Sequence, residues 1–201
     1  MQTMTLQAEV REQSGKGPAR QLRMRGLIPA IYYGPGTDAV KLAVSPDAVS
    51  KALRGEYRRN QLLELEIDGE KKLAITKDLA VHPLSRALLH VDFYAVSEDR
   101  PVETTVPFLT SGRSKGVLSG GDLRKLFRVL PIRAVPHKVP AAITLDITDI
   151  DQGEDVLVQD LKLDDGVTVT YPATRRVLYV DQAKAPELEE ENAGEGEKAE
   201  A

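Results

Sequence analysis

Short stretches in which apolar and polar residues alternate recur along the whole chain, and this pattern predicts a mainly β protein. In the first half, Asp68-Gly69 is a strong hairpin signal between two such stretches. The connections are too short for repeated crossovers between parallel strands, so we expect a closed, mainly antiparallel barrel or sheet. Six strands are predicted there: 4–10, 28–33, 40–44, 63–67, 71–79 and 88–96.

Two short helices are predicted between these strands. The first covers 19–26 and follows a glycine-rich loop. Pro18 suits its first turn, and Gly26 suits its end. It has only about two turns, so tertiary packing must hold it in place. The second begins at Pro46 with Ser45 as its N-cap and continues to Gly55.

The second half of the chain is predicted to be a separate all-β module. Turn-forming residues separate short alternating stretches there, which is typical of such modules. Strands are expected near 102–106, 143–147, 156–158, 167–171 and 177–180, whereas 120–127 fits either a helical turn or a strand. We therefore expect domains at 1–96 and 97–183.

Charge is distributed unevenly along the chain, which has a formal net charge of −4. Residues 1–96 carry +3, residues 97–183 carry −2 and residues 184–201 carry −5. The last segment has a single large apolar residue and is expected to be a disordered acidic tail. Five basic residues fall within the first 25, and a local basic patch of this kind favours a polyanionic partner.

Composition and motifs speak against catalysis and against metal or cofactor binding. The chain has no cysteine, which excludes disulfides, thiol nucleophiles and cysteine-based zinc sites. The three histidines are widely spaced, and no catalytic motif or small-molecule site stands out. No apolar run approaches the ~20 residues that span a bilayer, and no secretory signal is seen. We expect a cytoplasmic protein that is not an enzyme.

The candidate chemistry is RNA recognition. Tyr33 could stack on a base, and His90 and Asp92 share one face of a strand, where the carboxylate could accept hydrogen bonds from a base amine or a 2′-hydroxyl. The alternatives are a solvated helix face, a packed tyrosine and a core histidine, and these residues alone do not decide between them. Four basic side chains could neutralise phosphates: Arg11, Lys16, Arg20 and Arg23.

Three stretches carry a resemblance to a known family. Residues 9–34 and 77–93, joined by the Asp-Gly hairpin, resemble the bacterial large-subunit ribosomal protein L25 family, including its general stress protein CTC type. The stretch 112–167 resembles the additional β domain of the long CTC forms. About 180 residues are covered, and the ordered series of motifs is more specific than any single one.

This resemblance implies a six-stranded barrel similar to the anticodon-binding domain of glutaminyl-tRNA synthetase, followed by a second all-β domain. It also implies a structural constituent of the large ribosomal subunit, in contact with neighbouring ribosomal proteins, that binds 5S rRNA near loop E. Two alternatives are a stress-linked protein-interaction module with little RNA affinity, and tRNA binding. The family's RNA-contacting positions fall on Arg11, Arg20, Arg23, Tyr33, His90 and Asp92, with Lys16 in support. Ala80 stands where the family usually has glutamine.

Overall fold

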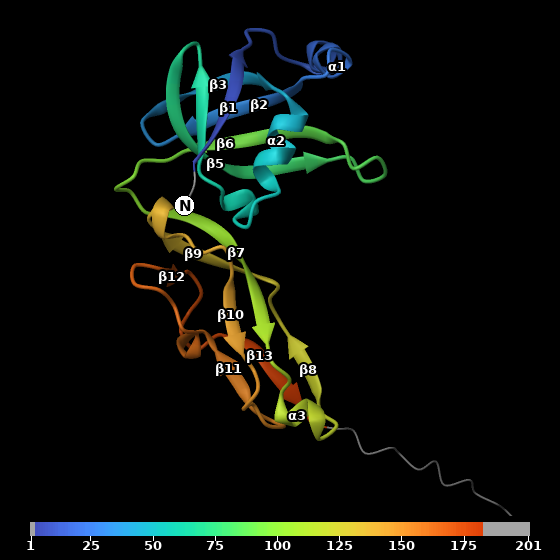
Figure 1. Ribbon diagram of the computed structural model, residues 1–201, viewed down its shortest axis with the longest axis vertical. Coiled ribbons are helices and arrows are strands. Elements are labelled where there is room, and N and C mark those ends of the chain that lie inside the picture. Colours follow the sequence, from blue (N-terminus) through green and yellow to red (C-terminus); the bar gives the residue numbers. More distant parts are fainter. Residues whose placement is uncertain (1–2, 183–201) are drawn as a thin grey trace, which may run out of the picture.

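The computed structural model describes residues 3–182, which form two β-rich parts arranged along one long axis (Figure 1). The first is a closed barrel of six strands and the second is built from two small sheets. The predicted fold class is therefore confirmed. The expected disordered tail at 184–201 lies outside the described residues.

The barrel follows the strand order β1-β3-β2-β6-β5-β4 and closes where β1 pairs with β4. The β1–β4 and β2–β6 pairs are parallel and the other four pairs are antiparallel, as a mainly antiparallel barrel requires. Its strands are β1 Met4–Val10, β2 Ile28–Gly34, β3 Thr37–Val44, β4 Leu63–Ile67, β5 Glu70–Val81 and β6 Leu88–Ala95.

Alternate residues of each strand fill the barrel interior. On β6, Val91 and Phe93 are fully buried, and on β4, Leu63 and Leu65 are fully buried as well. Successive side chains of a strand point to opposite faces, so their neighbours face outward. The apolar alternation in the sequence thus fixes which polar side chains the barrel presents on its outer surface.

Both predicted helices are present, with altered boundaries. The first, α1, covers Lys16–Met24, so it starts within the expected loop. The second, α2, covers Pro46–Leu53, and a short 3₁₀ turn, η1, follows at Arg58–Asn60. Ser45 is the N-cap residue of α2, but its side chain makes no capping hydrogen bond. The predicted N-cap residue is thus confirmed, whereas the predicted end at Gly55 lies beyond the last helical residue, Leu53.

The second domain has a sheet of order β10-β7-β9-β12 and another of order β11-β13-β8. The open question at 120–127 is resolved as strand β8, while β9 and the helix α3 were not predicted. The strands are β7 Val102–Ser111, β8 Asp122–Lys125, β9 Val129–Ala134, β10 Ile143–Asp146, β11 Asp155–Leu157, β12 Thr168–Val169 and β13 Arg176–Asp181, with helical turns α3 Lys115–Leu118, η2 Pro136–Lys138 and η3 Val158–Asp160.

The helix α3 lies where the sequence suggested only a turn. Ser114 explains the difference, because its hydroxyl accepts a hydrogen bond from the Val117 backbone N–H and caps the helix. The same hydroxyl donates to the Ile150 carbonyl at 2.7 Å, which ties the helix to a distant loop. A contact so remote in sequence cannot be inferred from local propensity.

A buried asparagine joins the two domains. The side chain of Asn60, only 4% exposed, donates to the Thr105 carbonyl at 3.0 Å and accepts from the Thr104 hydroxyl at 2.6 Å. Ile75 of the barrel packs in one small apolar cluster with Val102 of β7. The start of β7 is therefore fixed to the barrel by hydrogen bonds as well as by apolar packing.

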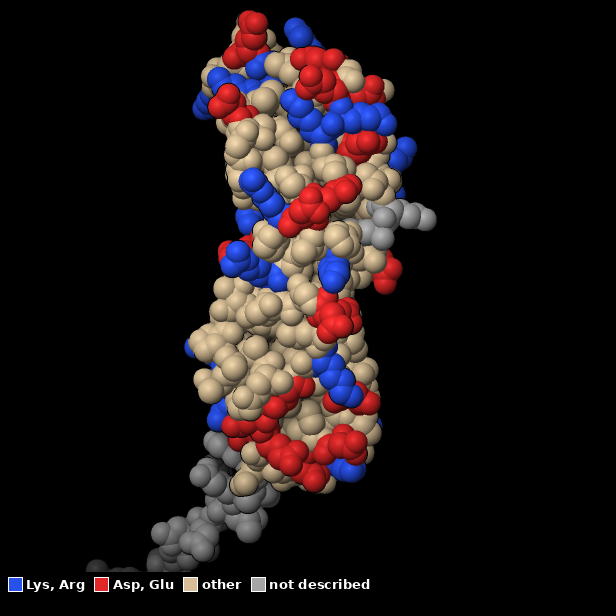
Figure 2. All heavy atoms as spheres, turned by 90° about the vertical axis from the view of Figure 1, so that its left-hand side faces the viewer, with Lys and Arg blue, Asp and Glu red and all other residues tan. Residues whose placement is uncertain are grey.

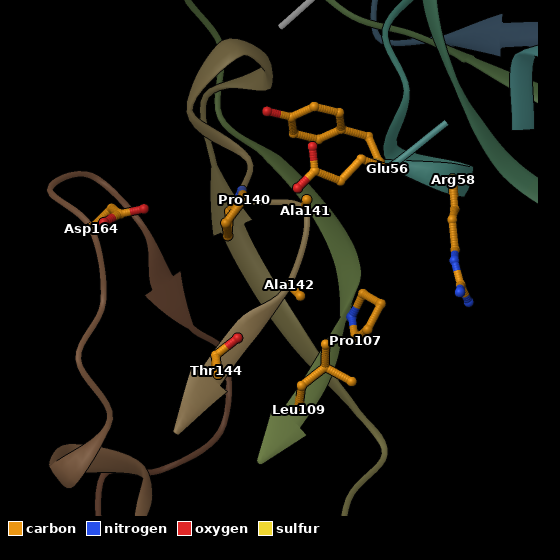
Figure 3. Close-up of a pocket in the computed structure, with 10 residues that line it drawn as sticks. Glu56, Arg58, Pro107, Leu109, Pro140, Ala141, Ala142, Thr144 and Asp164 are labelled. Carbon is orange, nitrogen blue, oxygen red and sulfur yellow. The ribbon is translucent and has the colours of Figure 1, made fainter. Parts of the chain in front are cut away.

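Beside this joint lies an open groove of about 580 Å³ (Figure 3). Glu56 and Arg58 line it from the barrel side, and Pro107 and Leu109 of β7 line it from the second domain. Its lining mixes polar with apolar residues, and its two barrel charges are of opposite sign. The groove gives no arrangement typical of a catalytic centre.

Candidate nucleic-acid interface

Strand β6 presents three polar or aromatic side chains on the outside of the barrel. His90, Asp92 and Tyr94 alternate with the buried Val91 and Phe93. His90 and Asp92 were predicted from the sequence, whereas Tyr94 was not. Its spacing of two residues beyond Asp92 was the signal that could have revealed it.

His90 and Asp92 contact each other directly. Nδ1 of His90 lies 2.7 Å from Oδ1 of Asp92, and the two side chains are 31% and 28% exposed. That carboxylate oxygen is buried and has no hydrogen-bond partner among the described residues. The imidazole and the carboxylate therefore lie against each other on the outer face of the strand.

Tyr33 lies next to this pair because β2 and β6 are neighbours. It is paired with Tyr94 across the two strands, and their rings meet edge to face at 5.8 Å. Burial raises the pKa of the Tyr33 phenol above its usual value, and the nearby Asp92 carboxylate raises it further. The hydroxyl consequently stays protonated at neutral pH and can act as a hydrogen-bond donor.

The predicted cations of α1 form an exposed row. Lys16, Arg20 and Arg23 are spaced at i, i+4 and i+7, which places them on one side of the helix. Nη2 of Arg23 donates to the Leu89 carbonyl at 3.3 Å, so the row meets β6 beside His90. We call this combined region the β6–α1 surface: Lys16, Arg20, Arg23, Tyr33, His90 and Asp92.

Arg11 is not part of the β6–α1 surface. Its Nε donates to the Leu42 carbonyl and its Nη1 donates to the Gln13 carbonyl, both at 3.0 Å. With Arg25 it lines a groove of about 480 Å³ beside α1. Its guanidinium therefore fastens the loop before α1, a role that sequence reasoning did not anticipate.

Strand β5 borders the same surface. Its Ala80 is paired with His90, and its Asp78 is paired with Asp92 and lies 3.8 Å from Arg59. Ala80, where the resemblance implies a glutamine, thus lies directly beside the histidine. Only a methyl group extends from the sheet at that position.

A glycine allows β2 and β6 to approach closely beside Tyr33. A methyl group at Gly34 would lie 2.5 Å from Cβ of Ala95 and 3.0 Å from its backbone nitrogen. We expect Gly34→Ala to lower the free energy of unfolding by about 1–3 kcal/mol, because overpacking displaces the strands. Thermal unfolding of the full chain measures this. Gly17→Ala, in open space within α1, is the control and should be neutral or stabilising.

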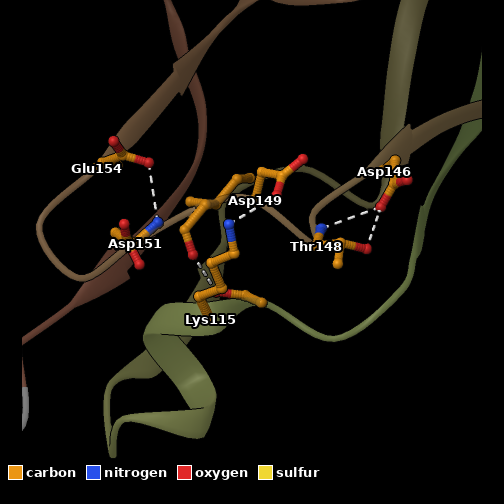
Figure 4. A network of polar contacts seen from close by, with 8 residues as sticks. Lys115, Asp146, Thr148, Asp149, Asp151 and Glu154 are labelled. Carbon is orange, nitrogen blue, oxygen red and sulfur yellow. Dashed lines mark hydrogen bonds and ion pairs between the residues drawn. The ribbon is translucent and has the colours of Figure 1, made fainter.

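Acidic side chains gather at the end of the second domain that is remote from the barrel (Figure 2). They serve local structure (Figure 4): Asp146 accepts from the hydroxyl of Thr148, Asp149 pairs with Lys115 at 2.8 Å, and Glu154 accepts from a backbone N–H. The hydrogen bond from Thr148 lowers the pKa of the Asp146 carboxyl. These acidic side chains therefore stabilise the fold of the turn that carries them.

The described residues contain neither a metal-binding cluster nor a membrane-spanning helix. Within residues 3–182, histidine, aspartate and glutamate side chains nowhere gather in a group of three that could hold a metal ion. No helix in that part of the chain is both long enough and apolar enough to cross a membrane. The β6–α1 surface is therefore the functional candidate in the barrel.

Comparison with known proteins divides the chain in two. Residues 6–93 match the Ribosomal L25p family, and residues 101–184 match the C-terminal domain of ribosomal protein TL5. A protein named "Large ribosomal subunit protein bL25" from Anaeromyxobacter dehalogenans is 40% identical over 92% of this chain and 76% of its own length. Its namesake from Sorangium cellulosum is 37% identical, over 95% and 84% respectively.

Proposed function

The chain belongs to the Ribosomal L25p family, and from this premise we propose that it binds 5S rRNA, near loop E, through its N-terminal barrel. Members of this family are structural proteins of the large ribosomal subunit, not enzymes, and the chain accordingly belongs to the cytoplasmic ribosome. Residues 1–96 are the proposed RNA-binding unit, and neighbouring ribosomal proteins are further proposed partners.

The proposal rests on the His90–Asp92 pair, which lies beside the row of cations on α1. Three exposed cations can replace counterions along a phosphate backbone. An aspartate among them would repel phosphates, so its presence indicates a contact in which it accepts a hydrogen bond. In a shallow RNA minor groove, base amines and 2′-hydroxyls supply such donors. The β6–α1 surface therefore suits a helical RNA whose groove lies against β6.

The distribution of charge over the two domains also favours an orientation in which the barrel faces the RNA. The row on α1 lies at the barrel, whereas acidic side chains gather at the opposite end of the second domain (Figures 1 and 2). A polyanion is attracted to the first region and repelled by the second. Binding with the barrel against RNA keeps the acidic end at a distance.

A binding assay with the full chain tests the proposal. We expect wild-type protein to prefer 5S rRNA over an unrelated duplex of equal length by at least tenfold at moderate salt. Arg20→Ala should weaken binding to both RNAs and reduce the salt slope by about 0.7–0.9, because one phosphate contact is lost. Arg124→Ala is the matched control, since Arg124 lies on β8 and is paired with Asp122 at 2.9 Å.

The remaining outcomes distinguish the alternatives. Equal binding to both RNAs would refute specific recognition of 5S rRNA. Competition by tRNA at equal strength would favour a general tRNA-type barrel. Protein that travels with large subunits while ignoring isolated 5S rRNA would instead favour a protein-interaction module.

A further inference from the structure

The second domain presents an exposed arginine against two aromatic rings. The rings of Phe127 and Tyr171 lie 5.0 Å apart with an interplanar angle of 35°. Cζ of Arg175 lies 5.6 Å from the first ring centroid and 5.9 Å from the second. Both rings are half-buried, whereas the arginine is exposed.

The backbone holds this group in place. The N–H of Arg175 donates to the Pro172 carbonyl, and its carbonyl accepts from the N–H of Val158, both at 2.9 Å. Phe127 and Tyr171 belong to segments adjoining β9 and β12, which pair with each other. The guanidinium is therefore presented from a structured surface, which lowers the entropy lost when it binds.

A second exposed arginine, Arg128, directly follows Phe127, whose ring Arg175 contacts. In the described part of the chain, neither Arg175 nor the exposed Arg128 takes part in an ion pair. Burial lowers the pKa of Lys125, and the charge of the nearby Arg128 lowers it further. By contrast, Arg124 and Arg176 on neighbouring strands are paired with carboxylates at 2.9 and 2.5 Å.

We propose that Arg128 and Arg175 form a second RNA-contacting site, which binds phosphate groups of ribosomal RNA. An arginine stacked on aromatic rings keeps its N–H groups at the edge of the guanidinium plane, where they fit the oxygens of a phosphate in bidentate geometry. The rings fix the guanidinium plane through cation–π contact. This inference rests on the proposed function, because ribosomal RNA is the polyanion that it brings to the protein.

A second site changes how the protein is held. The barrel and the second domain are joined by the Asn60 hydrogen bonds, so RNA bound at the first site would confine the second within a small volume. Two weak sites linked in this way reach a combined affinity well above either one, provided the geometry allows both to bind together. The Arg175 site would thereby add affinity without its own sequence specificity.

The absence of cysteine allows a direct test. A single cysteine at exposed Thr174, next to Arg175, can carry an iron–EDTA group that cleaves nearby RNA. The full-length variant is bound to large subunits lacking this protein, and a variant with its cysteine at exposed Ser119 is the control. We expect rRNA cleavage from position 174 and none from position 119. No cleavage from position 174 would overturn the proposal. It would show that this surface faces solvent or a protein in the subunit.

Substitution of the arginines gives an independent measurement on the same subunits. The pair Arg128→Ala and Arg175→Ala should weaken binding about tenfold at moderate salt and reduce the salt slope by about 1.4–1.8, which corresponds to two phosphate contacts. The matched control replaces the ion-paired Arg124 and Arg176 and should change affinity less than twofold. An unchanged slope in the first double variant would contradict the proposal.

The two proposals can fail separately. Loss of specific binding to isolated 5S rRNA overturns the proposed function of the barrel, and the cleavage pattern on subunits then still reports whether RNA lies beside position 174. Conversely, specific 5S rRNA binding without cleavage from position 174 supports the barrel site and rejects the second one.

Discussion

Replacing Asp92 with alanine is expected to reduce the affinity of the full chain for 5S rRNA by about 10- to 100-fold, the range for loss of one hydrogen bond to a charged group. The carboxylate lies 2.7 Å from Nδ1 of His90, and its side chain is partly open to solvent. Removing it takes away the acceptor that we assign to the RNA groove. Titration of labelled 5S rRNA at fixed salt measures the change.

A neighbouring carboxylate provides the control. Asp78 is paired with Asp92 across β5 and β6 and carries the same charge, but it is more exposed and lies near Arg59. Asp78→Ala removes one negative charge and should leave RNA affinity equal or slightly higher. If both variants bind RNA more tightly, Asp92 only repels phosphate and our assignment of its role is wrong.

Replacing Phe93 with alanine is expected to cost about 3–5 kcal/mol of folding free energy in the barrel. Phe93 is fully buried and lies between Asp92 and Tyr94 along β6. Since a domain has only about 5–15 kcal/mol of stability, much of the barrel population should unfold at lower temperature. Thermal unfolding together with 5S rRNA binding follows this change, and both should be impaired.

Phe108 offers the matched substitution in the other domain. It is 1% exposed and lies in the core of the second domain. Phe108→Ala should destabilise that domain to a similar extent and leave binding to isolated 5S rRNA within a few-fold of wild type. If both variants lose 5S rRNA binding equally, the barrel does not act as the RNA-binding unit by itself.

The barrel could be predicted from the sequence because the signals for its strands and turns lie within short segments. The alternation through Leu63, Leu65 and Ile67 marks which side chains enter the core, and the hairpin that follows uses Asp68 and Gly69, both with positive φ. Each feature needs only a few neighbouring residues. The strand count and the mainly antiparallel pairing followed from these signals together.

The second domain was predicted less well because its elements depend on remote contacts. Strand β9 contains Pro131 and shows no strong periodic signal, whereas β12 falls within the strand predicted at 167–171 but has only two residues. Helix α3 relies on Ser114 and on the carbonyl of Ile150, more than thirty residues away. Such elements depend on contacts with residues that are distant in sequence, and local sequence patterns do not predict these contacts.

The individual residues of the candidate site were predicted from the sequence, but which of them lie together in space was not. Sequence spacing placed His90 and Asp92 on one face, while the separation of Arg11 from the row on α1 required the fold. The carbonyls that Arg11 contacts belong to a neighbouring strand and to the following loop. Its part in RNA recognition stays a prediction.

The hydrogen bonds of Asn60 have a mechanical consequence. A buried amide that holds Thr104 and Thr105 opposes bending between the barrel and β7, so we expect the elongated molecule to behave as a stiff arm. When one end of such an arm is anchored, the other end is kept at a set distance and direction. The protein can thereby act as a spacer that sets the reach between its anchoring point and whatever meets its far tip.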